Sequence, residues 1–207
     1  MVGVLLDRCK FMDEEKLKEE LVRSVKTLFS KGYVSVGGGN HSFRYKELIW
    51  ITPSGYPRSH LNAKDLVLID INGKIIGGDL RPSIETPFHT QIYKVRDDIN
   101  AVSHTHSPYT HALAQASLLI EKSNGIFSFK ELEFPKILGN IAVLEYRQLG
   151  SKALAKLVGE ASYDSNIMIL LDHGVVSLGR CIHEAVFYIL LLEEFARCFL
   201  VSRILDA

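Results

Sequence analysis

The spacing of hydrophobic residues along the chain predicts both helices and strands. Apolar side chains three and four residues apart predict an amphipathic helix over about residues 13–30, with Asp13 as its N-cap and Gly32 near its end. A second apolar pattern predicts a helix from about Ile182 to Leu205, and the charged residues within it favour a core helix over a membrane span. Further helices are predicted to begin near Gly150, Pro108 and Pro87, the last with Thr86 as its N-cap.

Short apolar or alternating runs between these helices are typical of strands. The run 167–171 is apolar throughout, which predicts a central strand buried on both faces. Asn72-Gly73 separates the runs 65–70 and 74–76 and predicts a β-hairpin with a type I′ turn. Residues 121–140 show no clear pattern. The remaining strands are predicted over about 41–45, 48–52, 99–102, 141–144 and 175–179.

Composition narrows the class of protein. The chain has 207 residues, of which 47% are hydrophobic, so we expect residues 1–207 to form one domain with a substantial core. Its 24 basic and 24 acidic residues balance, and without a basic excess we expect neither nucleic acid nor a membrane as a partner. The three cysteines, Cys9, Cys181 and Cys198, form no CxxC pair, which favours a reducing, cytoplasmic setting.

The most informative stretch for chemistry is Ser103-His104-Thr105-His106-Ser107, which follows the apolar run 99–102. Side chains two residues apart on a strand point to the same face, so the two imidazoles should project side by side. Two imidazoles held in this way form half of a zinc site, which needs about four ligands. Taken alone the pair is a weak signal, because polar surface residues can have the same spacing.

Two further residues could complete such a site. His173 follows the buried strand 167–171 and precedes Gly174, which allows a bend, so His173 is either functional or a turn residue with a local hydrogen bond. Glu85 stands just before the helix that begins at Pro87, where the helix dipole favours a carboxylate. The alternative for Glu85 is a simple acid in the cap region.

Two turns could bind an anion. Gly37-Gly38-Gly39-Asn40 precedes a strand, and its backbone N–H groups can form an anion-binding nest, although an ordinary flexible turn has the same composition. Thr52-Pro53-Ser54-Gly55 is rich in hydroxyl and amide donors and is a second candidate phosphate-binding turn.

Together these segments resemble the class II aldolase/adducin family, which includes fuculose-1-phosphate aldolases and ribulose-5-phosphate 4-epimerases. The resemblance covers nearly the whole chain, from Gly39 to about Arg197, and the motifs occur in the family's order. The family's G-N-x-S turn is matched at 39–42, its I-T-P-S-G turn at 51–55, its A-V-x-H-T-H-S segment at 101–107 and its N/D-H-G turn at 172–174. Arg81-Pro82-Ser83-Ile84-Glu85 resembles its K/R-P-S-S-E/D segment.

The resemblance implies an α/β fold, a three-layer α/β/α sandwich around a mostly antiparallel sheet, and a C4 homotetramer with active sites between subunits. It implies that a divalent metal, normally zinc, is bound by His104, His106 and His173. Glu85 matches the family's catalytic carboxylate, which ligates the resting metal in the aldolases and moves away to act as acid or base. Candidate contacts to the phosphate of a small sugar substrate are Asn40, Thr52, Ser54, Gly55 and Ser83.

These matches favour a zinc-dependent aldolase that cleaves a phosphorylated ketose, such as L-fuculose 1-phosphate, into dihydroxyacetone phosphate and an aldehyde (lactaldehyde). Cleavage leaves an enediolate, whose charge a zinc ion held by three neutral imidazoles can stabilise. Glu at position 85 fits the aldolases, because the epimerases usually carry Asp there, whereas Thr86-Pro87-x-His89 is epimerase-like. A sugar-phosphate 4-epimerase or a methylthioribulose-1-phosphate dehydratase is therefore the alternative. A non-enzymatic adducin-like domain is disfavoured by the intact set of three histidines and Glu85.

The chain departs from the aldolases at the phosphate pocket. Two positions that often carry hydroxyl residues hold Gly37 and Ile84. Each lost bond to a charged group weakens binding by about 1.5–3 kcal/mol, unless backbone N–H groups compensate. The tyrosine that the aldolases contribute near the subunit interface has no match in the poorly aligned region 121–140.

Overall fold

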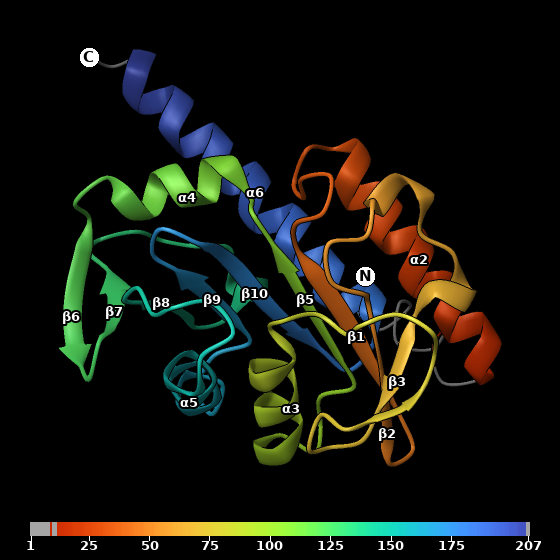
Figure 1. Cartoon of the computed structure of the whole chain (residues 1–207). Helices are drawn as coiled ribbons and strands as arrows, with labels where there is room; N and C mark the ends of the chain where they lie inside the picture. Colours follow the sequence, from red (N-terminus) through yellow and green to blue (C-terminus); the bar gives the residue numbers. More distant parts are fainter. Residues whose placement is uncertain (1–8, 10–11, 206–207) are drawn as a thin grey trace.

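The computed structural model describes residue 9 and residues 12–205, through which runs one mixed ten-stranded sheet (Figure 1). The strand order is β4-β3-β2-β1-β5-β10-β9-β8-β7-β6, and the neighbours pair antiparallel except β8 with β9. The predicted α/β class and mostly antiparallel sheet are confirmed. The strands are β1 (Asn40–Tyr45), β2 (Leu48–Ile51), β3 (Val67–Ile69), β4 (Ile75–Gly77), β5 (Ala101–Thr105), β6 (Leu119–Ser123), β7 (Ile126–Phe129), β8 (Ile141–Leu144), β9 (Ile167–Leu170) and β10 (Gly174–Gly179).

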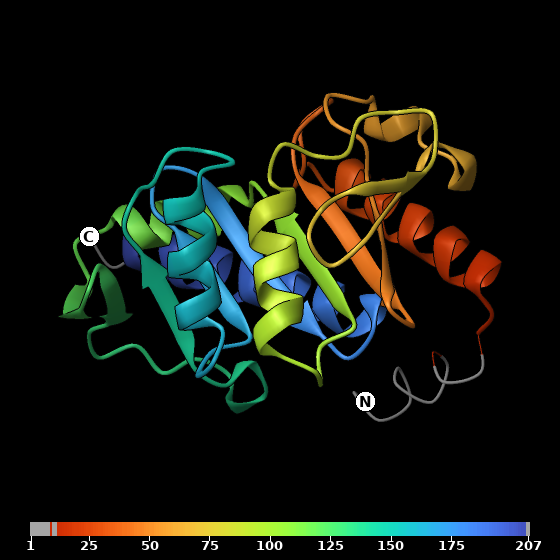
Figure 2. The same cartoon turned by 60° about the horizontal axis from the view of Figure 1, so that its bottom comes forward.

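Helices cover both faces of the sheet. On one face α3 (Thr86–Val95) and α5 (Lys152–Ala161) pack against each other, and on the other lie α2 (Glu14–Ser30), α4 (Pro108–Gln115) and α6 (Ile182–Leu205) (Figure 1 and Figure 2). Within the part of the chain that the structure describes, no helix combines the length and apolar character needed to cross a membrane. Short 3-10 helices lie at Arg58–His60, Ala63–Asp65 and Lys136–Leu138.

The long helices form where the apolar pattern predicts them. Asp13 is the N-cap of α2, and its Oδ1 accepts a hydrogen bond of 2.9 Å from the backbone N–H of Lys16. The helix α6 buries two acids, and both are satisfied. Glu193 accepts hydrogen bonds of 2.9 and 2.8 Å from the backbone N–H groups of Tyr109 and Thr110, which have no partner within the first turn of α4. Glu184 accepts hydrogen bonds from Arg180 and Tyr188.

Alternating side chains on β5 contribute to two hydrophobic cores. Val102 packs in the core beneath α3 and α5 with Phe88, and Ala101 packs in the core beneath α2 and α6 with Leu21. Burial of a side chain such as Val102 contributes about 1.5–3 kcal/mol, and the strand packs against a core on each face.

The strand directions bring the site residues to one edge of the sheet. β1 and β10 both flank β5 and both run antiparallel to it. The start of β1, the end of β5 and the start of β10 therefore meet. Asn40 lies directly opposite His104 across β1 and β5, and Val176 lies opposite His104 across β5 and β10.

The start of α3 corrects one prediction. The N-cap of α3 is Glu85, and Thr86 is already helical. The Thr86 hydroxyl instead donates a hydrogen bond of 2.6 Å to the carbonyl oxygen of Ser83. Glu85 is thus one residue closer to the helix than the sequence indicated, with a side chain that makes no capping hydrogen bond.

The predicted hairpin forms, but the prediction of its turn type was wrong. β3 and β4 form a hairpin, but its turn is not type I′, because Gly73 has a positive φ of 82° and Asn72 does not. The Asp70 carboxylate accepts from the backbone N–H groups of Asn72 and Lys74, which stabilises a different turn. A second hairpin, formed by β6 and β7, extends into the unpatterned stretch 121–140, and its turn residues Asn124 and Gly125 both have positive φ.

Candidate active site

The three histidines predicted as metal ligands lie together at the edge of the sheet. His104 is in β5, His106 follows it directly, and His173 lies in the turn before β10. One ring nitrogen of each lies within 4.8 Å of the other two. The Nε2 atoms of His104 and His173 are 3.1 Å apart. This convergence of nitrogen donors suits a divalent cation.

The orientation of His104 is set by β10. The carbonyl oxygen of Val175 lies 2.9 Å from Nδ1 of His104, and because a carbonyl only accepts, Nδ1 carries the proton. Nε2 therefore presents its lone pair toward His173, as in a metal-ligating histidine. Burial is the largest cause that lowers the pKa of His104, to about 3, and burial also lowers the pKa of His106. Both imidazoles are neutral at pH 7, the form that binds metals.

Gly174 is needed beside the histidines for space, not for a bend. A Cβ at this position would lie 2.2 Å from the carbonyl oxygen of Thr105 and 3.0 Å from Cε1 of His104. The residue of the turn with a left-handed backbone is Asp172, at a φ of 56°. The prediction that Gly174 permits the bend was therefore wrong. Gly174 instead allows β10 to approach β5 closely.

Glu85 lies against the histidine cluster at the start of α3. Its Oε2 is 3.3 Å from Nε2 of His104, and its Oε1 is 3.4 Å from Nε2 of His173. Burial raises the pKa of Glu85, but the contact with His173 and the hydrogen bond from Asn40 outweigh burial and lower the pKa to about 2. The carboxylate is therefore ionised at neutral pH.

A buried chain of polar side chains leads away from Glu85. Nδ2 of Asn40 donates to Oε2 of Glu85 at 2.8 Å, and Oδ1 of Asn40 lies 2.6 Å from Nε2 of His89. The hydroxyl of Ser42 lies 2.7 Å from Nδ1 of His89 and 2.8 Å from the hydroxyl of Tyr93. Burial lowers the pKa of His89 to about 3, so its imidazole is neutral. Asn40 is thus held between Glu85 and His89.

A cavity of about 320 Å³ lies beside Glu85, His106 and His173. The two turns predicted to bind an anion, 37–40 and 52–55, contribute to its wall. So do Gly37 and Ile84, the positions at which the chain departs from the aldolases. Besides Asn40, these lining residues are Gly37, Gly38, Gly39, Ser54, Gly55, Ser83, Ile84 and Leu149. A Cβ at Gly37 would lie 3.4 Å from the carbonyl oxygen of Gly55, so the two turns touch.

The candidate phosphate contacts differ in their placement. Ser54 and Gly55 line the cavity at exposed positions. Ser83 also lines it, but is buried, and its hydroxyl accepts a hydrogen bond of 3.2 Å from the backbone N–H of Glu85. Thr52 is buried outside the lining residues, and its Oγ1 accepts from the backbone N–H of His41 at 3.1 Å. Thr52 therefore supports the turn.

The sequence analysis did not assign a role to two side chains of the site, those of His89 and Arg58. His89 was noted only as part of an epimerase-like motif, and its position one helical turn after Glu85 on the predicted helix was a usable signal. Arg58 lines the cavity although it is almost fully buried. A single arginine in the loop after the Thr52–Gly55 turn carried no signal that could have found it.

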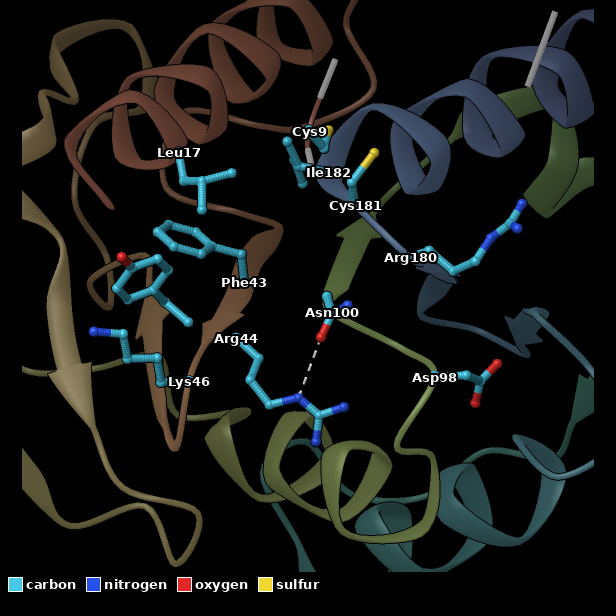
Figure 3. Close-up of a pocket in the computed structure, with 11 residues that line it drawn as sticks. Cys9, Leu17, Phe43, Arg44, Lys46, Asp98, Asn100, Arg180, Cys181 and Ile182 are labelled. Carbon is cyan, nitrogen blue, oxygen red and sulfur yellow. Dashed lines mark hydrogen bonds between the residues drawn. The ribbon is translucent and has the colours of Figure 1, made fainter. Parts of the chain in front are cut away.

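A separate cavity of about 460 Å³ lies away from this site, between the start of α6 and β1 (Figure 3). Its wall includes Arg44 and Asn100, whose side chains are joined by a hydrogen bond, and Cys181 on the side of α6 (Figure 3). None of the predicted site residues lines it.

Comparison with known proteins identifies the family. The sequence profile of the Class II Aldolase and Adducin N-terminal domain matches residues 19–200. The chain is 38% identical to the L-fuculose phosphate aldolase of Methanococcus maripaludis, over 86% of this chain and 93% of that protein. It is 31% identical to the 3-oxo-tetronate 4-phosphate decarboxylase of Haemophilus influenzae, over 88% and 86%. The structure of YgbL from Klebsiella pneumoniae superposes with a TM-score of 0.81 at 28% identity, over 92% and 91%. The protein belongs to the class II aldolase/adducin family.

Proposed function

We propose that the protein is a zinc-dependent aldolase that cleaves a phosphorylated ketose, such as L-fuculose 1-phosphate, into dihydroxyacetone phosphate and an aldehyde. The observation that carries the proposal is the position of an ionised carboxylate, Glu85, 3.3 and 3.4 Å from two neighbouring imidazoles at the wall of a cavity. The 38% identity to an L-fuculose phosphate aldolase supports the choice of substrate.

The donor set fits zinc. Three imidazole nitrogens converge with Glu85, and Oε1 of Glu85 is buried without a hydrogen-bond partner among the described residues. The metal would be held by His104, His106 and His173, with Glu85 as the fourth ligand in the resting site. When bound, zinc supplies a Lewis acid that polarises the carbonyl and hydroxyl oxygens of the substrate.

Glu85 is the residue that moves a proton at carbon. In the direction of addition its carboxylate removes a proton from the carbon of dihydroxyacetone phosphate that becomes the nucleophile. In cleavage the C4 hydroxyl loses its proton to water and the bond between C3 and C4 of the ketose breaks, with its electron pair left on the three-carbon fragment. The carboxyl group of Glu85, which takes up a proton from water, then delivers that proton to C3. Asn40 holds the carboxylate by donating a hydrogen bond to its Oε2, while the contacting turns 37–39 and 54–55 form one side of the cavity.

The relative from Haemophilus influenzae favours decarboxylation as a second candidate reaction. Loss of carbon dioxide from a four-carbon 3-oxo acid 4-phosphate leaves the same three-carbon enediolate as cleavage of a ketose 1-phosphate. One site could therefore serve both reactions, and the fragment that leaves distinguishes them. The epimerase and dehydratase alternatives release no three-carbon fragment.

The test is a product assay with the zinc-loaded protein. L-fuculose 1-phosphate, 5-deoxyribulose 1-phosphate and 3-oxo-tetronate 4-phosphate would be offered in parallel, and dihydroxyacetone phosphate, aldehyde and carbon dioxide would be measured. We expect dihydroxyacetone phosphate with an equimolar aldehyde, and loss of both after chelation. Carbon dioxide without aldehyde would assign the decarboxylase instead, and release of neither fragment would contradict both.

The remaining features of the proposal concern assembly and location. The homotetramer is supported by apolar side chains left exposed at the end of α6, namely Val201, Ile204 and Leu205. The helices on both faces support the three-layer α/β/α description (Figure 2). The cytoplasmic setting is supported by the cysteines, none of which forms a disulfide among the described residues.

A further inference from the structure

Arg58 is one of the largest fully buried side chains of the protein, and its guanidinium binds backbone carbonyls. Nε donates to the carbonyl oxygen of Gly38 at 3.1 Å, and Nη2 donates to those of Gly37 and Gly39 at 3.3 and 2.6 Å. Nη1 donates to the carbonyl oxygen of Pro53 at 3.1 Å. A single cation therefore ties the glycine turn to the Thr52–Gly55 turn.

These hydrogen bonds change the electrostatic character of the glycine turn. Three successive carbonyl oxygens, which carry the negative ends of their peptide dipoles, are engaged by the guanidinium. The N–H of a trans peptide points away from its carbonyl, and the described chain has no cis peptide. The turn is therefore less repulsive to an anion than a turn with free carbonyl oxygens. This is the same wall at which Gly37 and Ile84 leave no hydroxyl donors.

The charge of Arg58 has no acidic partner among the described residues. A buried charge is costly unless a partner compensates it. Burial lowers the pKa of Arg58 to about 10, and the guanidinium remains cationic at pH 7. Of the residues that the structure describes, Glu85 and Arg58 are the two with ionised side chains that line the cavity. Glu85 lies against the histidines, whereas Arg58 binds the two turns, so an anion held at these turns would interact with the positive charge of Arg58.

We propose that Arg58 is the specificity-determining residue for a phosphorylated substrate, because it shapes the two turns at the cavity wall and supplies the positive charge that attracts the phosphate. The proposal rests on the proposed function in that it places the phosphate of the substrate at these turns. Arg58 acts through its charge and through the shape of the turns. Its attraction for phosphate compensates for the absence of hydroxyl groups at positions 37 and 84.

The test compares Arg58→Lys, which keeps the charge, with Arg58→Gln, which removes it. Arg81→Gln is the matched control, because Arg81 is exposed next to the same turn and does not line the cavity. Binding of inorganic phosphate to each zinc-loaded protein would be measured by calorimetry, with zinc content and circular dichroism recorded alongside. Any phosphate that binds at zinc does so in all variants, so only the difference between variants is read.

We expect Arg58→Gln to weaken phosphate binding at least about 10-fold, and Arg58→Lys to recover most of that loss. The Arg81→Gln protein should bind phosphate as the wild type does. Unchanged phosphate binding by the folded Arg58→Gln protein would overturn the proposal. Equal losses of phosphate affinity in Arg58→Gln and Arg58→Lys would also overturn it, because they would mean that the charge at position 58 does not matter. Phosphate binding is measured without turnover, so this test of Arg58 remains valid even if the protein cleaves no ketose phosphate.

A measurement on the wild-type protein covers the case in which Arg58→Gln does not fold. The Nε–H resonance of Arg58 would be assigned by its absence in Arg58→Lys and followed as phosphate is added. A shift that saturates with phosphate supports the proposal. A resonance that stays fixed at saturating phosphate contradicts it.

Discussion

Asn40 and Glu85 are joined by a hydrogen bond of 2.8 Å from Nδ2 of the amide to Oε2 of the carboxylate. Because this end of the amide donates, Oδ1 accepts, and the facing Nε2 of His89 must carry the proton. Nδ1 of His89 then accepts from the Ser42 hydroxyl, which in turn accepts from Tyr93. The hydrogen bonds all run toward Glu85 and fix the amide in the orientation that donates to it.

Replacement of His89 should therefore change the rate of the reaction without removing the metal. We expect His89→Leu, which cannot donate, to lower kcat about tenfold, the equivalent of one hydrogen bond of about 1.4 kcal/mol. His89→Gln retains an N–H donor and should recover part of the rate. The measurement is kcat and KM with zinc content as control, and equal rates for the two variants would contradict the directional chain.

Loss of a single histidine should abolish metal binding and leave the fold intact. His106 follows β5 and carries little of the core, so we expect His106→Ala to remain folded by circular dichroism and to lose its zinc by elemental analysis. His111→Ala is the matched control, because His111 lies on α4 outside the cluster. Stoichiometric zinc in the His106→Ala protein would refute the ligand assignment.

Glu85 should be required for proton exchange at carbon as well as for cleavage. Glu85→Gln keeps the size of the side chain but cannot accept a proton, and we expect kcat to fall by about 10²–10⁴-fold. In heavy water the wild type should exchange one C–H proton of dihydroxyacetone phosphate for deuterium, which proton NMR detects. The variant should lose this exchange, while Glu121→Gln, at an exposed position, should retain it. Exchange at the wild-type rate in Glu85→Gln would assign the proton transfer to another group.

The ion pair at the start of α6 should make stability depend on pH. Burial raises the pKa of Glu184, but the hydrogen bonds from Arg180 and Tyr188 outweigh burial and lower it. A lowered pKa in the folded state means that the stabilisation is present above the unfolded pKa of about 4.3 and is lost as the pH falls through the folded value.

We expect Glu184→Gln to lower the free energy of unfolding by about 1.5–3 kcal/mol at pH 7 and by much less at pH 3. Urea unfolding at the two pH values measures the difference. Glu160→Gln, at an exposed position on α5, should have little effect at either pH. A penalty for Glu184→Gln that is the same at both values would mean that its charge does not contribute.

The sequence predicted the histidine cluster because its signals are local. His104 and His106 lie two residues apart next to an apolar strand, and His173 follows the apolar run 167–171. Asn72-Gly73 and Asn124-Gly125 have the same composition, yet only the second has positive φ at both residues. The side chain of Asp70 accepts hydrogen bonds from the backbone of the Asn72-Gly73 turn and stabilises a different turn type. The Asn-Gly dipeptide alone is therefore not sufficient to predict the turn type.

What the sequence could not provide were contacts between distant segments. The hydrogen bonds of Arg58 to residues 37–39 join segments that the antiparallel pairing of β1 with β2 brings together. The contact of His89 with Asn40 joins α3 to the start of β1. The sequence alone suggests that Gly174 allows a bend, because its crowding against Thr105 arises only between two paired strands. Local patterns identify elements, and the packing between elements decides what each side chain does.

The pairing of β5 with β10 has a consequence for how the protein is made. His104 and His106 leave the ribosome together, whereas His173 is 69 residues beyond His104. A growing chain therefore carries a histidine pair, and only the closure of the second half of the sheet adds the third nitrogen. Metal uptake would thus follow synthesis of nearly the whole chain, and prematurely ended chains would be left without metal.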